Sequence, residues 1–118
     1  MDNRRKHPRY HVAIAAEVET ARGTLAGETR DVSEGGVAVI LHEPLSEQST
    51  IDVTLLLTQD GIEDANEEPF ECKASVMWAA PTEDGQQMMG LRFTQVRPDQ
   101  LARLQRFLAQ LQASSRAG

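Results

Sequence analysis

The chain has 118 residues, of which 40% are hydrophobic and 25% charged, and its net charge at pH 7 is −6. This length and balance are typical of a single globular domain with a core of its own. The acidic total argues against general binding to nucleic acids, because a DNA-binding surface needs basic side chains to match many phosphates.

Short apolar segments and a lone cysteine indicate a cytoplasmic location. The longest apolar runs fall far below the ~18 residues of a membrane-spanning helix, and the first residues lack the apolar stretch of a signal peptide. Cys72 is the only cysteine, so the chain cannot form an internal disulfide, which fits a reducing compartment. We therefore expect a cytoplasmic protein that does not insert into membranes.

The first segment of the chain is basic. Arg4, Arg5, Lys6 and Arg9 lie near the start, where the only acid is Asp2. Such a cluster is most often a solvated tail, and it can also form a local anion site on an otherwise acidic body. The segment by itself leaves both interpretations open.

Five or six strands are predicted in the middle of the chain. Apolar and polar residues alternate there with the period of two that is typical of half-buried strands. The predicted strands are residues 11–19, 23–30, 37–41, 51–57, 70–78 and 89–93, and the fifth places Phe70, Cys72, Ala74, Val76 and Trp78 on its core side. Because polar turns and no helices separate these segments, the pattern predicts an antiparallel sheet closed into a barrel.

Two of the connecting segments have distinctive sequences. Residues 31–36 read Asp-Val-Ser-Glu-Gly-Gly, an ordinary turn sequence, because Asp and Ser bond nearby backbone and glycine permits positive φ and close approach of a ligand. Residues 60–71 hold six acids and no basic residue. We interpret this acidic segment as a solvated loop or, alternatively, as a docking surface for a basic partner.

One helix is predicted, from Pro98 to Leu111, as a lid on one end of the barrel. An uncovered face of Leu and Phe would instead indicate a dimer or partner surface. Residues 113–118 are expected to form a flexible tail, so the domain is predicted to span residues 1–112. The apolar face holds Leu101, Leu104, Phe107, Leu108 and Leu111, and the polar face holds Gln100, Arg103, Arg106 and Gln110.

Two spaced motifs carry a family resemblance. Arg5 and Arg9 form an RxxxR pattern, and Asp31, Ser33 and Gly36 form a DxSxxG pattern after it. The ordered pair resembles the RxxxR and (D/N)xSxxG signatures of the PilZ family, whose members commonly bind the bacterial second messenger cyclic di-GMP. The resemblance implies a six-stranded antiparallel β-barrel with one C-terminal helix and with the arginines just before the first strand. Residues 90–93, Gly-Leu-Arg-Phe, resemble the last strand of the family.

The resemblance also implies a set of ligand-binding residues, and their chemistry suits the ligand. A planar guanidinium can donate two parallel hydrogen bonds to O6 and N7 of guanine, which lysine cannot do. We assign the carboxylate of Asp31 to the guanine N1–H and N2–H₂ donors or to orienting an arginine, and the hydroxyl of Ser33 to one further bond. The expected site consists of Arg4, Arg5, Arg9, Asp31, Ser33, Gly35 and Gly36.

Arg4 precedes the RxxxR motif directly and bears on stoichiometry. In the family, the residue at this place influences whether one nucleotide or an intercalated pair is bound, and arginine resembles the pair-binding type. A further guanidinium can offset the repulsion of four phosphates and stack on an exposed guanine. We therefore expect two cyclic di-GMP molecules per chain, with Arg4 as a solvated tail residue being the alternative.

The sequence favours a receptor over an enzyme. His7, His11 and His42 do not have the spacing of a metal site, and no Gly-x-Ser-x-Gly elbow is present, so we expect no catalysis, metal or cofactor. The leading hypothesis is a cyclic di-GMP receptor that relays binding to an unidentified protein partner by a conformational change, in regulation of motility or biofilm formation. The alternative is a nucleotide-independent PilZ-like interaction adaptor. In either case we expect a monomer or a weak homodimer.

Overall fold

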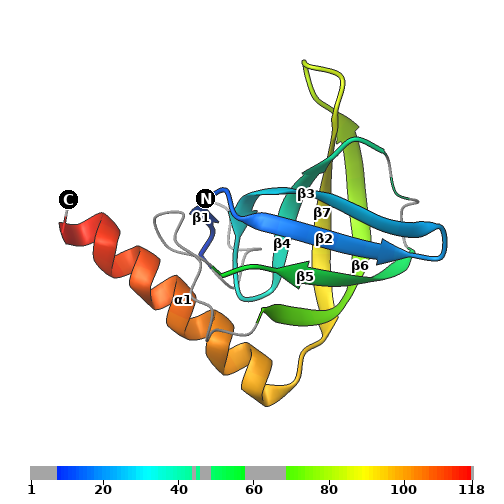
Figure 1. Cartoon of the computed structure of the whole chain (residues 1–118). Coiled ribbons are helices and arrows are strands. Elements are labelled where there is room, and N and C mark those ends of the chain that lie inside the picture. The colour runs from blue at the N-terminus through cyan, green and yellow to red at the C-terminus, as the bar shows by residue number, and fades with distance from the viewer. Residues whose placement is uncertain (1–7, 44, 46–48, 58–68, 118) are drawn as a thin grey trace.

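The computed structural model describes residues 8–43, 45, 49–57 and 69–117 (Figure 1). Arg4, Arg5 and nearly all of the acidic segment therefore lie outside the described residues. The described residues form seven strands and one helix. In chain order these are β1 (Tyr10–His11), β2 (Ala15–Thr20), β3 (Gly23–Val32), β4 (Gly36–Leu41), β5 (Thr50–Leu55), β6 (Phe70–Pro81), β7 (Gln87–Gln95) and α1 (Pro98–Ala117).

Six of the strands close into an antiparallel barrel. Their order around the barrel is β3-β2-β5-β6-β7-β4, and a further pairing of β4 with β3 joins the two ends. The short strand β1 pairs with Asp31 and Val32 at the end of β3, on the same edge of β3 that β2 pairs with further back. Closure leaves no long free edge, which a sheet of this length would otherwise expose to other chains. The predicted six-stranded barrel with a C-terminal helix is confirmed.

The core consists of the inward-facing positions of all six barrel strands. Val18, Val53 and Val76 are fully buried, as the alternation of the sequence predicts. Two aromatic rings contribute as well: Phe70 and Phe93 pack at a centroid distance of 5.2 Å. The few aromatic residues of the chain therefore add to a mainly aliphatic core rather than forming it.

The predicted strand 11–19 is interrupted, and Thr29 is the reason. Residues 12–14 lie between β1 and β2. The side chain of Thr29 on β3 is buried, accepts a hydrogen bond from the Ile14 amide (3.0 Å) and donates one to the Val12 carbonyl (2.5 Å). These bonds satisfy backbone groups that the interrupted strand leaves without ladder partners. The segment that follows Arg9 is thereby held against the barrel.

Helix α1 lies across one end of the barrel, as Figure 1 shows. Its residues Leu104, Phe107 and Leu108 are buried in the same cluster as the inward residues of the strands, so the interpretation as a lid is confirmed. The helix continues past the predicted end, as far as Ala117. In the described part of the chain, no helix is long and apolar enough to span a membrane.

Gln100 is predicted on the polar face of the helix, but the structure buries it. It is 3% exposed, and its side-chain carbonyl accepts a hydrogen bond of 2.8 Å from the amide of Glu71. Pairing of β6 with β7 begins only at Lys73 and Gln95, so the amide of Glu71 lies beyond the ladder. The first turn of α1 covers this strand end, and Gln100 supplies the acceptor that the amide of Glu71 lacks in the β6–β7 pairing.

The burial of α1 predicts that the helix contributes strongly to stability. Leu104→Ala should lower the free energy of unfolding by about 2–5 kcal/mol, because it leaves a cavity at a fully buried position. The matched variant Arg106→Ala, at an exposed position of the same helix, should change it by less than about 0.5 kcal/mol. Urea unfolding followed by circular dichroism measures both, and equal midpoints would contradict the role as a lid.

Candidate functional site

The described motif residues meet at one hollow on the outside of the barrel. The hollow has a volume of about 650 Å³, within the range of small-molecule sites. Arg9, Asp31 and Ser33 line it on one side together with Gly35 and Gly36. The structure therefore brings together every predicted site residue that it describes, and Arg4 and Arg5 lie outside the described residues.

The opposite side of the hollow holds residues that the motifs do not include. Met77 and Trp78 line it on β6, and Arg92 on β7 lies between that strand and Gly36 of the turn. Met77 and Trp78 are the exposed large hydrophobic residues of the described chain, at 47% and 38%. An aromatic ring and a guanidinium that face one hollow are suited to a ligand with flat, polar rings and negative charge.

A β-bulge brings Asp31 to the hollow. The register of β3 against β4 shifts between Thr29 and Asp31, so that Arg30 is an extra residue with no partner in the pairing. Such a bulge reverses which face the following residues occupy. Thr29 is buried inside, whereas Asp31 pairs with Ala38 and lies on the outer face.

A second bulge brings Trp78 to the same face, which corrects the predicted core position of this residue. Val76 pairs with Leu91 and is fully buried, but the register shifts before Trp78, which pairs with Gly90. Met77 is the extra residue. Alternate side chains up to Val76 point into the barrel, and after Met77 this alternation is shifted by one residue, so Trp78 points outward. The strict alternation in the sequence did not reveal the shift, because a bulge inserts one residue without changing the composition.

The floor of the hollow is nearly free of side chains. Asp31, Ala38, Gly90 and Trp78 follow one another across β3, β4, β7 and β6. A Cβ atom added at Gly90 would lie 2.1 Å from Nε1 of Trp78, so the indole ring rests directly on the backbone of β7. Glycine at this position allows the ring to lie low over the sheet while its exposed part faces the hollow.

The turn before β4 is held by the side chain of Ser33. Its hydroxyl oxygen accepts hydrogen bonds from the amides of Gly35 and Gly36, both at 3.2 Å, and the hydroxyl donates to the Gly36 carbonyl, also at 3.2 Å. Ser33 is only 8% exposed. Its structural role in the turn is therefore clear, and its expected bond to a ligand stays a prediction.

Gly35 and Gly36 do not use the positive φ that glycine permits. Among the described glycines, those with positive φ are Gly23 and Gly85, each in a hairpin turn. Glycine is needed at position 36 for a different reason: an added Cβ atom would lie 2.2 Å from the carbonyl oxygen of Leu91. The close approach of β4 to β7 excludes a side chain there.

Two cations of the hollow are unpaired. Neither Arg9 nor Arg92 has an ion pair or side-chain hydrogen bond with another residue of the described chain. Both side chains are exposed, so water solvates them and a ligand can displace that water at modest cost. The hollow therefore offers guanidinium groups that are free to bind an anion.

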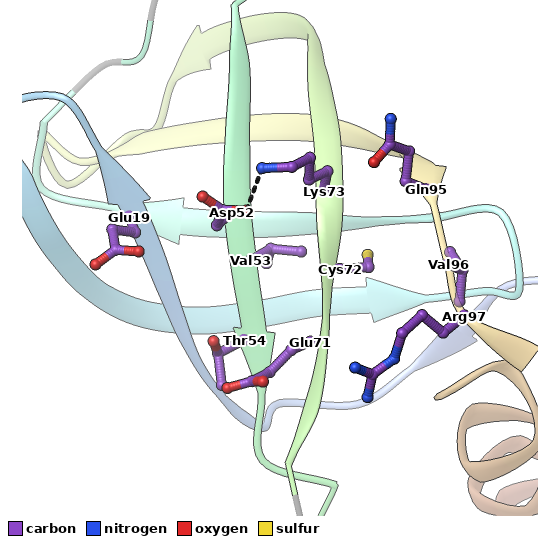
Figure 2. A pocket seen from close by; sticks show the side chains of 10 residues that line it. All are labelled: Glu19, Asp52, Val53, Thr54, Glu71, Cys72, Lys73, Gln95, Val96 and Arg97. Carbon is purple, nitrogen blue, oxygen red and sulfur yellow. Dashed lines mark hydrogen bonds and ion pairs between the residues drawn. The ribbon is translucent and has the colours of Figure 1, made fainter. Parts of the chain in front are cut away.

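A second hollow, of about 620 Å³, lies on the outer side of β5 and β6 and has a different character (Figure 2). Lys73 forms an ion pair with Asp52 at 3.0 Å, drawn as a dashed line in Figure 2. Arg97 also lines this hollow and pairs with Asp99 at 3.2 Å. Because both cations are already matched by carboxylates, this hollow is less suited to an anionic ligand.

Cys72 lines the second hollow and is a poor nucleophile. Burial raises the pKa of its thiol to about 12, and the negative charge of Asp52 adds to the increase. At neutral pH the thiol is therefore protonated, whereas the thiolate is the reactive form. The side chain packs against the hydrophobic core rather than offering reactive chemistry.

Comparison with known proteins identifies the family. The sequence matches the PilZ domain over residues 3–110, which is most of the chain. The chain belongs to the PilZ domain family. A search of curated protein sequences gave no significant match.

Solved structures show the same PilZ fold. The barrel of YcgR from Escherichia coli, described as a PilZ domain with c-di-GMP, matches with a TM-score of 0.73 at 21% identity over 98% of this chain and 96% of that one. The inhibitor of motility MotI/DgrA from Bacillus subtilis matches with a TM-score of 0.78 at 16% identity, over 96% of this chain and 53% of its own. The c-di-GMP complex of MrkH from K. pneumonia gives 0.76 at 18% identity, over 98% and 56%. This chain therefore spans about half the length of MotI/DgrA and MrkH.

The two glycines of the site predict different effects when a methyl group is added. Gly36→Ala should destabilise the barrel by about 1–3 kcal/mol, because its Cβ would meet the backbone of β7 and the strands would have to part. Gly90→Ala should cost less, because its Cβ meets only the indole of Trp78, which can swing away. Trp78 is the only tryptophan, so its fluorescence emission should shift in Gly90→Ala. Urea unfolding and emission spectra measure both effects, and a Gly36→Ala chain as stable as the wild type would contradict the close approach.

Proposed function

We propose that this PilZ domain is a receptor for cyclic di-GMP, which binds between the N-terminal RxxxR segment and the DxSxxG turn. The observation that carries the proposal is the convergence of Arg9, Asp31 and Ser33 at a hollow that is also lined by an unpaired Arg92, the pairing partner of Gly36. Cyclic di-GMP combines two phosphates with two guanines, and these groups need cations and fixed polar partners respectively. The similar structures of YcgR and MrkH are complexes with c-di-GMP, which supports the choice of ligand.

In the proposed complex, each motif side chain has a separate task. Arg5 and Arg9 bind phosphate oxygens or the O6 and N7 edge of a guanine. Asp31 accepts from guanine N–H donors or orients an arginine, and its carboxylate has no hydrogen-bond partner among the described residues. Gly35 and Gly36 leave the backbone of the turn open to the ligand. No step of this proposal requires a metal, a cofactor or catalysis.

The same two segments also touch helix α1, which supports a relay from the ligand to a partner protein. Beside Arg9, Pro8 and Tyr10 line a small cavity of about 170 Å³ against the helix. In the turn, the carboxylate of Glu34 accepts a hydrogen bond of 3.1 Å from the side-chain amide of Gln105 on α1. A ligand that reorders the arginine segment or the turn would therefore change contacts with the helix.

The proposed role is cytoplasmic signalling through an unidentified protein partner. The similar protein MotI/DgrA is an inhibitor of motility, which supports a role in motility or biofilm regulation. In this proposal the partner distinguishes the empty domain from the ligand-bound domain at α1 and the neighbouring N-terminal segment. Differential contact of this kind is the physical requirement for any ligand-driven switch.

The arginines of the RxxxR motif provide the first test. Arg5→Ala and Arg9→Ala should each weaken cyclic di-GMP binding at least tenfold, because a charged hydrogen bond is worth about 1.5–3 kcal/mol and each factor of ten is about 1.4 kcal/mol. Isothermal titration calorimetry measures the affinities. Arg22→Ala, an exposed arginine in the β2–β3 turn, removes the same charge outside the hollow and should change affinity less than twofold.

This control separates a specific site from general attraction of an anion to positive charge. Unaltered affinity in both motif variants would refute the site. A wild-type chain that binds cyclic di-GMP no better than GTP would refute the proposed function and favour the nucleotide-independent adaptor.

Arg4 provides the second test, which concerns stoichiometry. We predict two cyclic di-GMP molecules per chain in the wild type and a shift toward one in Arg4→Leu, because the lost guanidinium no longer offsets the repulsion between stacked ligands. Calorimetry with protein of known active concentration measures both values. A stoichiometry of one in the wild type refutes the pair, and a value unchanged by Arg4→Leu leaves Arg4 without a role in setting it.

A further inference from the structure

We propose that Arg92 and Trp78 form a second recognition subsite, which holds one guanine of the ligand on the β6–β7 side of the hollow. This inference rests on the proposed function. The motif residues occupy the β3 side and the turn, and none of them comes from β6 or β7. A ligand with two purine bases requires a place for the second base, and the structure offers one that the motifs do not describe.

The dimensions of the floor suit two separate subsites. Asp31 and Trp78 lie at the two ends of one row that crosses β3, β4, β7 and β6. Neighbouring strands are ~4.8 Å apart, so these two residues are separated by about 14 Å along the sheet. A single base cannot contact both ends of such a row. Between them lie only Ala38 and Gly90, which leave the floor low enough for a ligand to bridge the two ends.

Trp78 supplies a stacking surface in this subsite. Its ring rests on the backbone at Gly90, so that the backbone supports one side of it, and its exposed part faces the hollow. Because the ring is already held in place, it loses less conformational entropy when a ligand binds than a freely rotating ring would. Stacking on an aromatic ring accepts any base, so Trp78 contributes affinity rather than a choice among bases.

Arg92 makes the subsite selective for guanine. It lies between Gly36 on β4 and Ser75 on β6 in the row next to that of Trp78, and its guanidinium has no partner in the described chain. Because Gly36 has no side chain, nothing from β4 occupies the space beside it. A guanidinium fork matches O6 and N7 of guanine, whereas adenine offers a donor in place of O6. Arg92 is thus placed to prefer guanine for a base that stacks on the neighbouring Trp78.

The test compares cyclic di-GMP with cyclic di-AMP in wild type, Arg92→Gln and Arg92→Lys. Arg92→Gln should weaken binding of cyclic di-GMP about tenfold and reduce the preference over cyclic di-AMP by a similar factor, because glutamine can bond N6 and N7 of adenine in two places. Arg92→Lys keeps the charge, loses the fork and should also weaken cyclic di-GMP binding. Arg22→Gln is the matched control outside the hollow and should leave both affinities within twofold.

The stacking half of the subsite has its own readout. Trp78 is the only tryptophan, so cyclic di-GMP should change the intrinsic fluorescence of the chain on binding. Trp78→Leu should weaken binding about tenfold, and Trp78→Phe, which keeps a ring, should restore most of the affinity. Circular dichroism checks that each variant retains the barrel.

The outcomes separate this inference from the proposed function. Wild-type binding of cyclic di-GMP with unchanged affinity in the Arg92 and Trp78 variants overturns the subsite and leaves the receptor in place. Loss of affinity in Arg92→Gln without a change in base preference also overturns it, because the residue would then act by charge alone. A wild-type chain that binds no cyclic di-GMP overturns both.

Discussion

The close approach of β4 and β7 is the constraint on which the site depends. At Gly36 the carbonyl oxygen of Leu91 occupies the place where a Cβ atom would lie, and at Gly90 the indole of Trp78 does the same. At these two positions the strands therefore present backbone rather than side chains. A flat ligand can lie close to such a surface, and polar side chains at its borders can reach the ligand from both sides.

Two β-bulges place the functional side chains at those borders. Each bulge adds one residue, Arg30 in β3 and Met77 in β6, and so reverses the face of the residues after it. Without the first bulge Asp31 would follow the inward phase of Thr29, and without the second Trp78 would follow that of Val76. Burying the carboxylate unpaired would cost several kcal/mol, and the bulge avoids this while aiming the group at the hollow.

The two large hollows of the described chain differ in whether their cations are paired with carboxylates. In the second hollow each cation is matched by a carboxylate, whereas Arg9 and Arg92 are left free on a protein whose total charge is −6. Such a local positive site can attract an anion that the body as a whole repels. The turn beside it is hydrogen-bonded to α1 through Glu34 and Gln105, so the site is in direct contact with the helix.

The barrel, its lid helix and the motif half of the site could be predicted from the chain alone, because period-two alternation, hairpin turns and short spaced motifs are local properties. Arg9, Asp31 and Ser33 could be named from their motifs, and the structure places all three at one hollow. The other half of the site depends on how distant strands pair. Alternation alone predicts a core position for Trp78 and indicates no special role for Arg92. The Met77 bulge and the pairing of Arg92 with Gly36 and of Trp78 with Gly90 become known only from the structure. Register between strands far apart in sequence is set by packing of the whole barrel, and no local pattern records it.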